Sequence, residues 1–226
     1  MGDHGEVDLV IFDCDGVLVD SEPIVSRVLA DRMRHLGIQI TDQECATAFA
    51  GLDQAAAARL IADRLGDAVP TGWFDSLTVA VDTALRAEVA PVPGVVSVLQ
   101  QFCVPFCVAS NGRPEKVALT LGVCGLAPYF EGRIFTAAEV AHGKPAPDLF
   151  LLAASRMGVP PARCVVVEDS ESGVVAALSA GMRVLRYVPD GSTSGSVRTF
   201  GDMAELPSLL GLADTNNSIS VRADSR

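Results

Sequence analysis

The sequence predicts an α/β protein in which a doubly wound parallel sheet is interrupted by an inserted group of helices. The apolar run Leu9–Phe12 stops at Asp13 and Asp15, a pattern typical of a buried strand that ends at a polar edge. Residues 21–90 show helical patterns and no strand pattern. From Gly94 onward strand-like and helix-like segments alternate, which favours a parallel sheet covered by helices on both faces.

Local capping signals define the helices of the insertion, expected over about residues 23–36, 41–50, 54–65 and 72–89. Ser21 is a candidate N-cap with Pro23 just inside the first helix, which Gly37 ends. Thr41–Glu44 has the pattern of a capping box. Asp53 is a candidate cap of the third helix.

The alternating part predicts helix 95–102, strand 104–109, a helix begun by Pro114, a strand near 133–136, helix 148–157, strand 164–167, helix 172–180 and a final strand 183–188. We therefore expect an α/β core domain formed by residues 1–20 and 91–212. A helical domain, 21–90, interrupts it. The polar, aperiodic segment 213–226 is predicted to be a disordered tail.

Composition narrows the class of function. Half of the residues are hydrophobic and 20% are charged, as in a soluble globular protein. A net charge of -11 argues against nucleic acid and anionic membranes as partners. The chain has no export signal and no apolar stretch of about 18 residues, so a cytoplasmic location is expected. No sustained apolar stripe lies outside the core pattern, which favours a monomer.

The six cysteines form no CxxC pair and several lie in apolar runs, so they are interpreted as reduced core residues. Cys14 is expected to pack inward. His142 is interpreted as a loop histidine.

Polar residues follow several predicted strands. These are Asp13 and Asp15, Ser110 and Asn111, Lys144, and Glu168 and Asp169. Each has an ordinary explanation as a turn former, a surface lysine or a charge at the start of a helix. If the strands are neighbours, however, these side chains converge on one crevice. Two carboxylates two residues apart could then serve as nucleophile or metal ligand and as acid and base.

Taken together, these segments resemble the four motifs of the haloacid dehalogenase superfamily, in its phosphatase and phosphomutase branch. The stretch Asp13–Glu22 reads DxDGxxxDSE, the first motif, and the resemblance extends from Val7 to about Val188. It implies a doubly wound core with a helical cap inserted after the first motif. The helical segment 21–90 stands at that place.

The resemblance also implies roles for individual residues. Asp13 would attack phosphorus and become an aspartyl phosphate, because a carboxylate forms a readily hydrolysed mixed anhydride. Asp15 would be the general acid and base. Lys144 would neutralise the charge of nucleophile and phosphate. Phosphoryl oxygens would be held by Ser110, the Asn111 amide and Gly16, and Mg²⁺ by Asp13, Asp15 and Asp169, helped by Glu168.

The cap is expected to select the substrate, through a loop formed by Gly51, Leu52, Asp53 and Gln54. An ordinary helix–helix turn explains this break equally well. Asp20–Glu22 would be the hinge of cap closure, although helix capping is a sufficient explanation of its sequence.

We therefore expect a Mg²⁺-dependent phosphatase that acts on a small phosphorylated metabolite, a sugar or sugar-acid phosphate. The resemblance is closest to sugar-phosphate and phosphoglycolate phosphatases, so 6-phosphogluconate-type substrates are candidates. A sugar phosphomutase would carry an arginine at Gln54 and a histidine at Val25, which disfavours isomerisation. A catalytically silent relative that binds a phosphometabolite or a protein is the remaining alternative.

Overall fold

The computed structural model describes residues 6–49, 54–189, 191 and 197–212. Its strands are β1 (Leu9–Phe12), β2 (Phe106–Ser110), β3 (Ile134–Thr136), β4 (Cys164–Glu168), β5 (Arg183–Tyr187) and β6 (Arg198–Phe200). Its α-helices are α1 (Glu22–His35), α2 (Asp42–Phe49), α3 (Gln54–Leu65), α4 (Trp73–Glu88), α5 (Val95–Gln101), α6 (Pro114–Val123), α7 (Asp148–Met157), α8 (Glu171–Ser179) and α9 (Leu206–Leu209).

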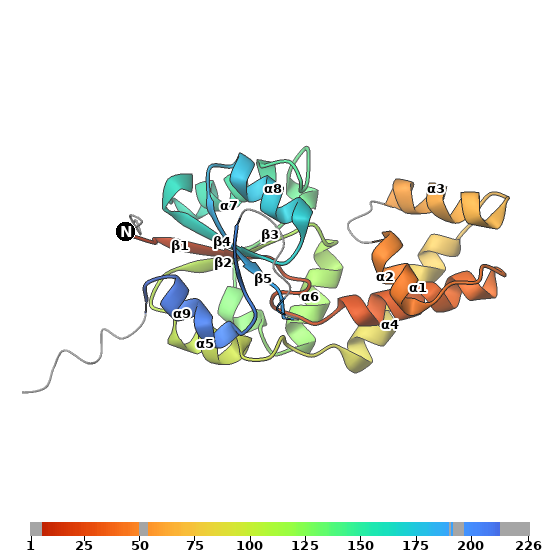
Figure 1. The fold of residues 1–226 in the computed structure, drawn as a ribbon, viewed down its shortest axis with the longest axis horizontal. Helices are drawn as coiled ribbons and strands as arrows, with labels where there is room; N and C mark the ends of the chain where they lie inside the picture. Colours follow the sequence, from red (N-terminus) through yellow and green to blue (C-terminus); the bar gives the residue numbers. More distant parts are fainter. Residues whose placement is uncertain (1–5, 50–53, 190, 192–196, 213–226) are drawn as a thin grey trace, which may run out of the picture.

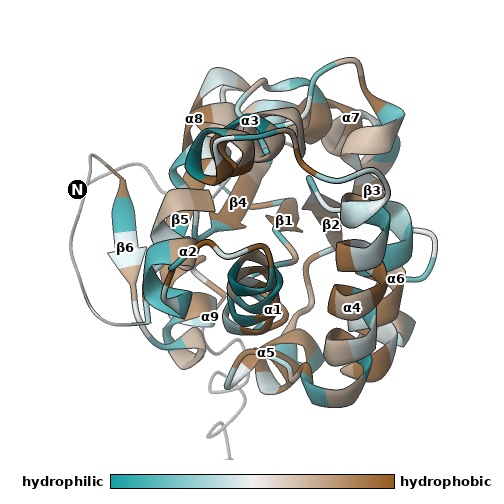
Figure 2. Cartoon of the chain, turned by 90° about the vertical axis from the view of Figure 1, so that its right-hand side faces the viewer, coloured by the Kyte–Doolittle hydropathy of each residue, from teal (hydrophilic) through white to brown (hydrophobic). Residues whose placement is uncertain are grey.

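All strands of the described sheet are parallel, in the order β3-β2-β1-β4-β5-β6, which is visible across Figure 2. Strand β1 lies between β2 and β4, with Ile11 opposite Cys107 on one side and Val166 on the other. The chain therefore builds outward from β1 first in one direction and then in the other. A crevice beyond the strand ends is expected at such a switch point. The predicted doubly wound α/β architecture is confirmed.

Alternate residues of β1 pack into different hydrophobic layers. Val10 and Phe12 join the layer that includes residues of α5, α6 and α9. Leu9 and Ile11 join the layer beneath α7 and α8 (Figure 1). Because both faces are covered, the strand is apolar throughout rather than alternating, as its sequence indicates.

Helices α1–α4 lie beyond the carboxyl ends of the strands (Figure 1), and apolar residues of α1 and α4 join the hydrophobic layer of Val10 and Phe12. The four helices have their own small core, which includes Met33, Cys45 and Ile61. Two crossing segments join them to the sheet domain and hydrogen-bond to each other: Asp20 N–H donates to the Ala90 carbonyl at 3.0 Å, and Val92 N–H donates to Leu18 at 3.0 Å. The helical character of this insertion is as predicted, whereas its action as a movable cap stays a prediction.

Ser21 stands at the N-cap position of α1, with Pro23 just inside the helix as predicted, but its side chain makes no capping hydrogen bond and its hydroxyl donates to Asp15 instead. One local expectation was wrong. The strand 183–188 is not the last, since β6 and α9 follow it. Strand β6 escaped prediction because it has three residues and only Phe200 is buried. The capping box is confirmed: Thr41 N–H donates to Glu44 at 2.8 Å, and Glu44 N–H donates to the Thr41 hydroxyl at 3.1 Å.

Within the described part of the chain, no helix has both the length and the apolar character needed to cross a bilayer. Residues Gly51, Leu52 and Asp53 of the expected specificity loop lie outside the described residues, as does the expected tail 213–226. Gln54 is the first residue of α3.

Candidate active site

The polar residues predicted at the strand ends meet because β2, β1 and β4 are neighbours. Asp13 directly follows β1, Ser110 is the last residue of β2, and Glu168 is the last residue of β4. All three side chains are buried. Buried polar groups require partners, and the contacts among these residues provide them.

Lys144 is the cationic centre of this cluster. Its ammonium donates to Asp13 Oδ1 and, at 2.7 Å, to Glu168 Oε1, while its side chain is 3% exposed. The ammonium also lies 4.8 Å from the centroid of the Phe150 ring. Burial acts to lower the pKa of Lys144, but the carboxylates of Asp13 and Glu168 outweigh it and hold the pKa above its usual value. Lys144 therefore stays charged between two carboxylates.

The Asn111 side chain hydrogen-bonds to both the N–H and the carbonyl of Lys144. The Asn111 amide donates from Nδ2 to the Lys144 carbonyl at 3.0 Å, and the Lys144 N–H donates to Asn111 Oδ1 at 2.9 Å. A Cβ at Gly143 would lie 2.7 Å from the same Oδ1, so the close packing of Asn111 against this loop requires glycine at position 143. Both polar groups of the Asn111 side chain are thus engaged with Lys144. Phosphate binding by the Asn111 backbone amide and by Ser110 stays a prediction; the Ser110 hydroxyl accepts from Gly112 N–H at 3.0 Å.

Glu168 is held by the loop that follows it. Its Oε2 accepts hydrogen bonds from Asp169 N–H at 3.0 Å and from the N–H and hydroxyl of Ser170, both at 2.9 Å. Oε1 faces the acidic group and accepts the hydrogen bond from the Lys144 ammonium. Gly173, in α8, lies so close that a Cβ there would be 1.7 Å from Oε1.

Asp13, Glu168 and Asp169 form a group whose ligand oxygens all lie within 4.8 Å of one another. Burial, together with the neighbouring carboxylates, raises the pKa of Asp169 to about 9. Burial raises the pKa of Asp13 to about 7, with Lys144 acting in the opposite direction and Glu168 and Asp15 adding to the rise. Lys144 contacts two of these three carboxylates, and the remaining negative charge of the group suits a hard divalent cation with oxygen ligands, such as Mg²⁺.

Gly16 packs directly against the Asp169 carboxylate, where there is no room for a side chain. Its φ is +77°, and a Cβ there would lie 2.1 Å from Asp169 Oδ2. The Gly16 N–H donates to the Val19 carbonyl at 2.9 Å. Its expected contact with phosphate stays a prediction, whereas its lack of a side chain beside Asp169 is a clear structural requirement.

Asp15 has partners of its own. Its Oδ1 accepts hydrogen bonds from the Ser21 hydroxyl and from Lys116 Nζ, the latter at 2.7 Å. Sequence reasoning missed Lys116, which lies in the first turn of α6 and belongs to none of the strand-end loops. A signal was present: Lys116 and Lys144 are the only lysines among 17 basic residues.

Two further expectations can be compared with the structure. Cys14 is fully buried, as predicted, and burial raises the pKa of its thiol well above the usual value. This disfavours a nucleophilic role, because the thiolate is the reactive form. His142 is exposed and lies 3.3 Å from Asp148, with no contact to the acidic group among the described residues.

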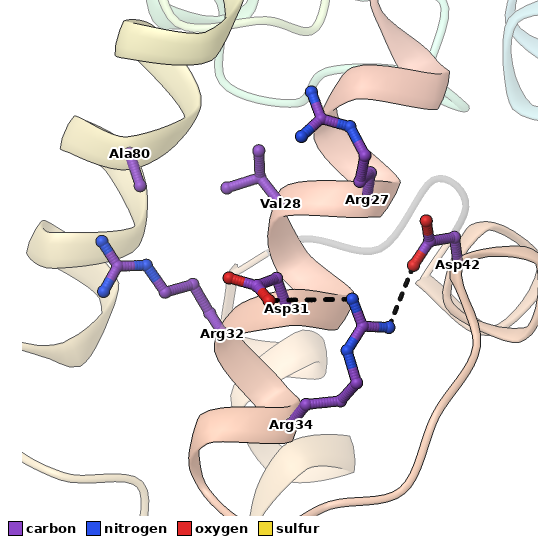
Figure 3. Close-up of a pocket in the computed structure, with 7 residues that line it drawn as sticks. All are labelled: Arg27, Val28, Asp31, Arg32, Arg34, Asp42 and Ala80. Carbon is purple, nitrogen blue, oxygen red and sulfur yellow. Dashed lines mark hydrogen bonds and ion pairs between the residues drawn. The ribbon is translucent and has the colours of Figure 1, made fainter.

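A separate hollow of about 460 Å³ lies among α1, α2 and α4 (Figure 3). Its arginines are mostly neutralised: Arg34 lies 3.0 Å from Asp42 and 3.8 Å from Asp31, and Arg27 lies 2.6 Å from Glu88. It contains none of the residues of the acidic group described above.

Comparisons with known proteins agree with this geometry. A family model described as haloacid dehalogenase-like hydrolase matches residues 7–181. The 6-phosphogluconate phosphatase of Escherichia coli is 29% identical over 208 residues, covering 90% of this chain and 94% of that protein. The fructose-1-phosphate phosphatase YqaB of the same organism is 34% identical, covering 76% and 92%. A crystal structure of a HAD family hydrolase from Deinococcus radiodurans, with bound phosphate and sodium, is 31% identical with a TM-score of 0.77, covering 91% and 97%.

Proposed function

The chain belongs to the haloacid dehalogenase-like hydrolase family, and on that premise we propose that it is a Mg²⁺-dependent phosphatase acting on a small sugar or sugar-acid phosphate. The observation that carries the proposal is the position of Lys144, whose ammonium contacts both Asp13 and Glu168 within the buried acidic group. The proposed nucleophile, a buried cation and the carboxylates proposed to hold the metal thus lie together at the carboxyl ends of the strands.

In the proposed reaction, a carboxylate oxygen of Asp13 attacks phosphorus while the ester oxygen leaves with a proton from Asp15. The product is an aspartyl phosphate and an alcohol. Asp15 then accepts a proton from the water that attacks the aspartyl phosphate, so both Asp13 and Asp15 are regenerated. Lys144 stabilises the negative charge that gathers near Asp13 in both steps. The Ser110 hydroxyl and the Asn111 backbone amide would orient the phosphoryl oxygens.

Mg²⁺ would be held by Asp13, Asp169 and Oε1 of Glu168, with the backbone carbonyl of Asp15 as a further ligand. When bound there, the ion offsets the repulsion between the carboxylates and the phosphate. The raised pKa values of Asp13 and Asp169 support this assignment, because they reflect a site with too much negative charge for its burial.

The relatives support the substrate class, because their names specify a sugar-acid phosphate and a sugar phosphate. Val25 supports hydrolysis over isomerisation: it is an apolar side chain packed against the core, where the phosphomutase alternative needs a histidine. A panel containing 6-phosphogluconate, fructose 1-phosphate and 2-phosphoglycolate would identify the preferred substrate. Glucose 6-phosphate formed from β-glucose 1-phosphate with a trace of the bisphosphate would favour the mutase.

The deciding experiment is phosphate release from p-nitrophenyl phosphate by wild type and by Asp13→Asn, with Mg²⁺ and with EDTA. We expect release only by wild type with Mg²⁺, together with a hydroxylamine-labile phosphoprotein on rapid acid quenching. Asp67→Asn, at an exposed position, is the matched control and should behave as wild type. An active Asp13→Asn variant would show that Asp13 is not the nucleophile. A folded wild type that releases no phosphate from any substrate would favour the catalytically silent alternative.

A further inference from the structure

Lysine is rare in this chain, and both lysines contact an aspartate of the same short motif. Lys144 contacts Asp13, and Lys116 contacts Asp15. The other basic residues of the sequence are all arginines. The two side chains differ chemically, because lysine is a compact point charge and arginine is a planar fork that spreads over two acceptors. The use of lysine at position 116 therefore suits a contact with one oxygen atom.

The local position of Lys116 does not favour a positive charge. It lies in the first turn of α6, where the helix dipole disfavours a cation and favours an anion such as the adjacent Glu115. Its side chain is also largely covered, at 18% exposure. The contact with Asp15 at 2.7 Å offsets both costs, so Asp15 is the feature that explains the residue.

Two chain segments hold the same oxygen of Asp15. Lys116 approaches Oδ1 from α6, and the Ser21 hydroxyl approaches it from the start of α1. Among the described residues, every hydrogen bond to this carboxylate reaches Oδ1. The other oxygen, Oδ2, lies on the side of Gly112, 3.5 Å from where a Cβ of that residue would stand. Two donors at one oxygen fix the plane of the carboxyl group and leave Oδ2 to carry the transferred proton.

We propose that Lys116 is a positioning residue that orients Asp15 for proton transfer to the leaving oxygen. The inference rests on the proposed phosphatase function. The proton on Asp15 Oδ2 passes to the ester oxygen as the P–O bond breaks and the bond from Asp13 to phosphorus forms. Lys116 keeps its own proton throughout. It acts through Asp15 and has no contact with the reacting atoms.

This role makes a distinctive prediction about leaving groups. An alkyl phosphate such as fructose 1-phosphate needs a proton on its leaving oxygen, whereas p-nitrophenolate leaves without one. The value of kcat/KM reports the steps up to the formation of the aspartyl phosphate, so a fault in proton donation lowers it for the alkyl ester alone. A structural fault, or a lost contact with the phosphate itself, would lower it for both substrates.

The test compares Lys116→Met with wild type on p-nitrophenyl phosphate and on fructose 1-phosphate or 6-phosphogluconate, whichever wild type hydrolyses. Methionine keeps the length of the side chain but removes the charge. We expect kcat/KM for the alkyl ester to fall roughly tenfold to a hundredfold, and that for p-nitrophenyl phosphate to change by less than about threefold. Lys116→Arg should recover much of the loss because it restores a charged donor. Lys116→Gln serves as a second uncharged variant if Lys116→Met does not fold.

A double variant separates action through Asp15 from an independent effect. Adding Lys116→Met to Asp15→Asn should lower kcat/KM for the alkyl ester no further than Asp15→Asn alone. Arg113→Met also removes one positive charge at the start of α6, where Arg113 contacts Asp82 at 2.9 Å. This control should leave the ratio of the kcat/KM values for the two substrates unchanged.

Failure of the Lys116 inference and failure of the proposed phosphatase function give different results. An active wild type whose substrate ratio is unaffected by Lys116→Met and Lys116→Gln would overturn this inference alone. A parallel loss on both substrates would also overturn it, since that pattern indicates a structural fault or a lost contact with the phosphate. A wild type that releases no phosphate from any ester would overturn the proposed function and, with it, this inference.

Discussion

The side chain of Asn111 and the backbone of Lys144 hold each other through two hydrogen bonds, at 3.0 Å and 2.9 Å. These residues lie 33 positions apart in sequence. Asn111 follows β2, whereas Lys144 lies in a loop before α7. The contact therefore aligns a loop with the sheet edge and directs the Lys144 ammonium between Asp13 and Glu168. Glutamine would be too long for the same pair of contacts, and aspartate cannot donate.

Asn111→Ala should weaken catalysis by releasing the backbone of Lys144. We expect a loss of about 1–3 kcal/mol in the free energy of unfolding, because two partly buried backbone groups of Lys144 lose their partners. The kcat/KM for p-nitrophenyl phosphate should fall at least roughly tenfold, since the ammonium would no longer be held between the carboxylates. Gln100→Ala, which removes an exposed amide contact to Tyr129, is the control and should change neither quantity. Wild-type kcat/KM in Asn111→Ala would show that Lys144 is positioned without its two hydrogen bonds to Asn111.

Ser21 and Thr41 look alike in sequence but should differ in function. Both precede a helix, yet only the Thr41 hydroxyl accepts a capping hydrogen bond, while that of Ser21 donates to Asp15. Thr41→Ala should therefore lower the free energy of unfolding by about 1 kcal/mol and leave kcat/KM unchanged. Ser21→Ala should lower kcat/KM for an alkyl phosphate roughly tenfold with little change in stability. Thermal unfolding and steady-state kinetics on both variants check the contrast; the reverse pattern would restore Ser21 as a helix cap.

The sequence predicted most of the fold because its strands are continuous apolar runs that end in polar residues. Asp13 and Glu168 could be located in this way, since each stands where such a run stops. Lys116 could not, because it lies 101 residues from Asp15 and within a helix, where a charged side chain is usually solvated. The sequence predicted the place of Ser21 at the start of α1 but not its contact with Asp15, because capping and that contact both use a hydroxyl at the same position. Only the folded geometry distinguishes the two.

Gly173 is expected to reverse the usual effect of adding a methyl group to a helical glycine. Gly→Ala in a helix ordinarily stabilises by about 0.5–1 kcal/mol. A Cβ at 173, however, would stand 1.7 Å from Glu168 Oε1 and force a buried carboxylate to move. Gly173→Ala should therefore destabilise by about 1–3 kcal/mol and abolish phosphate release, because Glu168 holds Lys144. Gly122→Ala in α6, where no atom lies within 4 Å of the added Cβ, is the matched control and should stabilise. A stable, active Gly173→Ala would show that Glu168 can move without harm.

The metal-free protein should lose stability as the pH rises. The folded-state pKa values of Asp13 and Asp169 are raised to about 7 and about 9, from the ordinary value of 3.8. At a pH between the ordinary pKa of 3.8 and these raised pKa values, the folded protein therefore binds more protons than the unfolded chain. The associated stability is fully present below about pH 4 and is lost as the pH rises through about 7 and then about 9.

Magnesium should oppose this loss, because it binds the deprotonated carboxylates. We expect the gain in Tm on replacing EDTA with Mg²⁺ to be small at about pH 5 and to grow up to about pH 9, which thermal scans in both buffers would measure. Asp169→Asn removes the carboxylate with the larger shift, so its Tm in EDTA should depend less on pH and respond less to Mg²⁺. A wild-type Tm in EDTA that stays level or rises across this range would contradict the excess of negative charge from which the metal site is inferred.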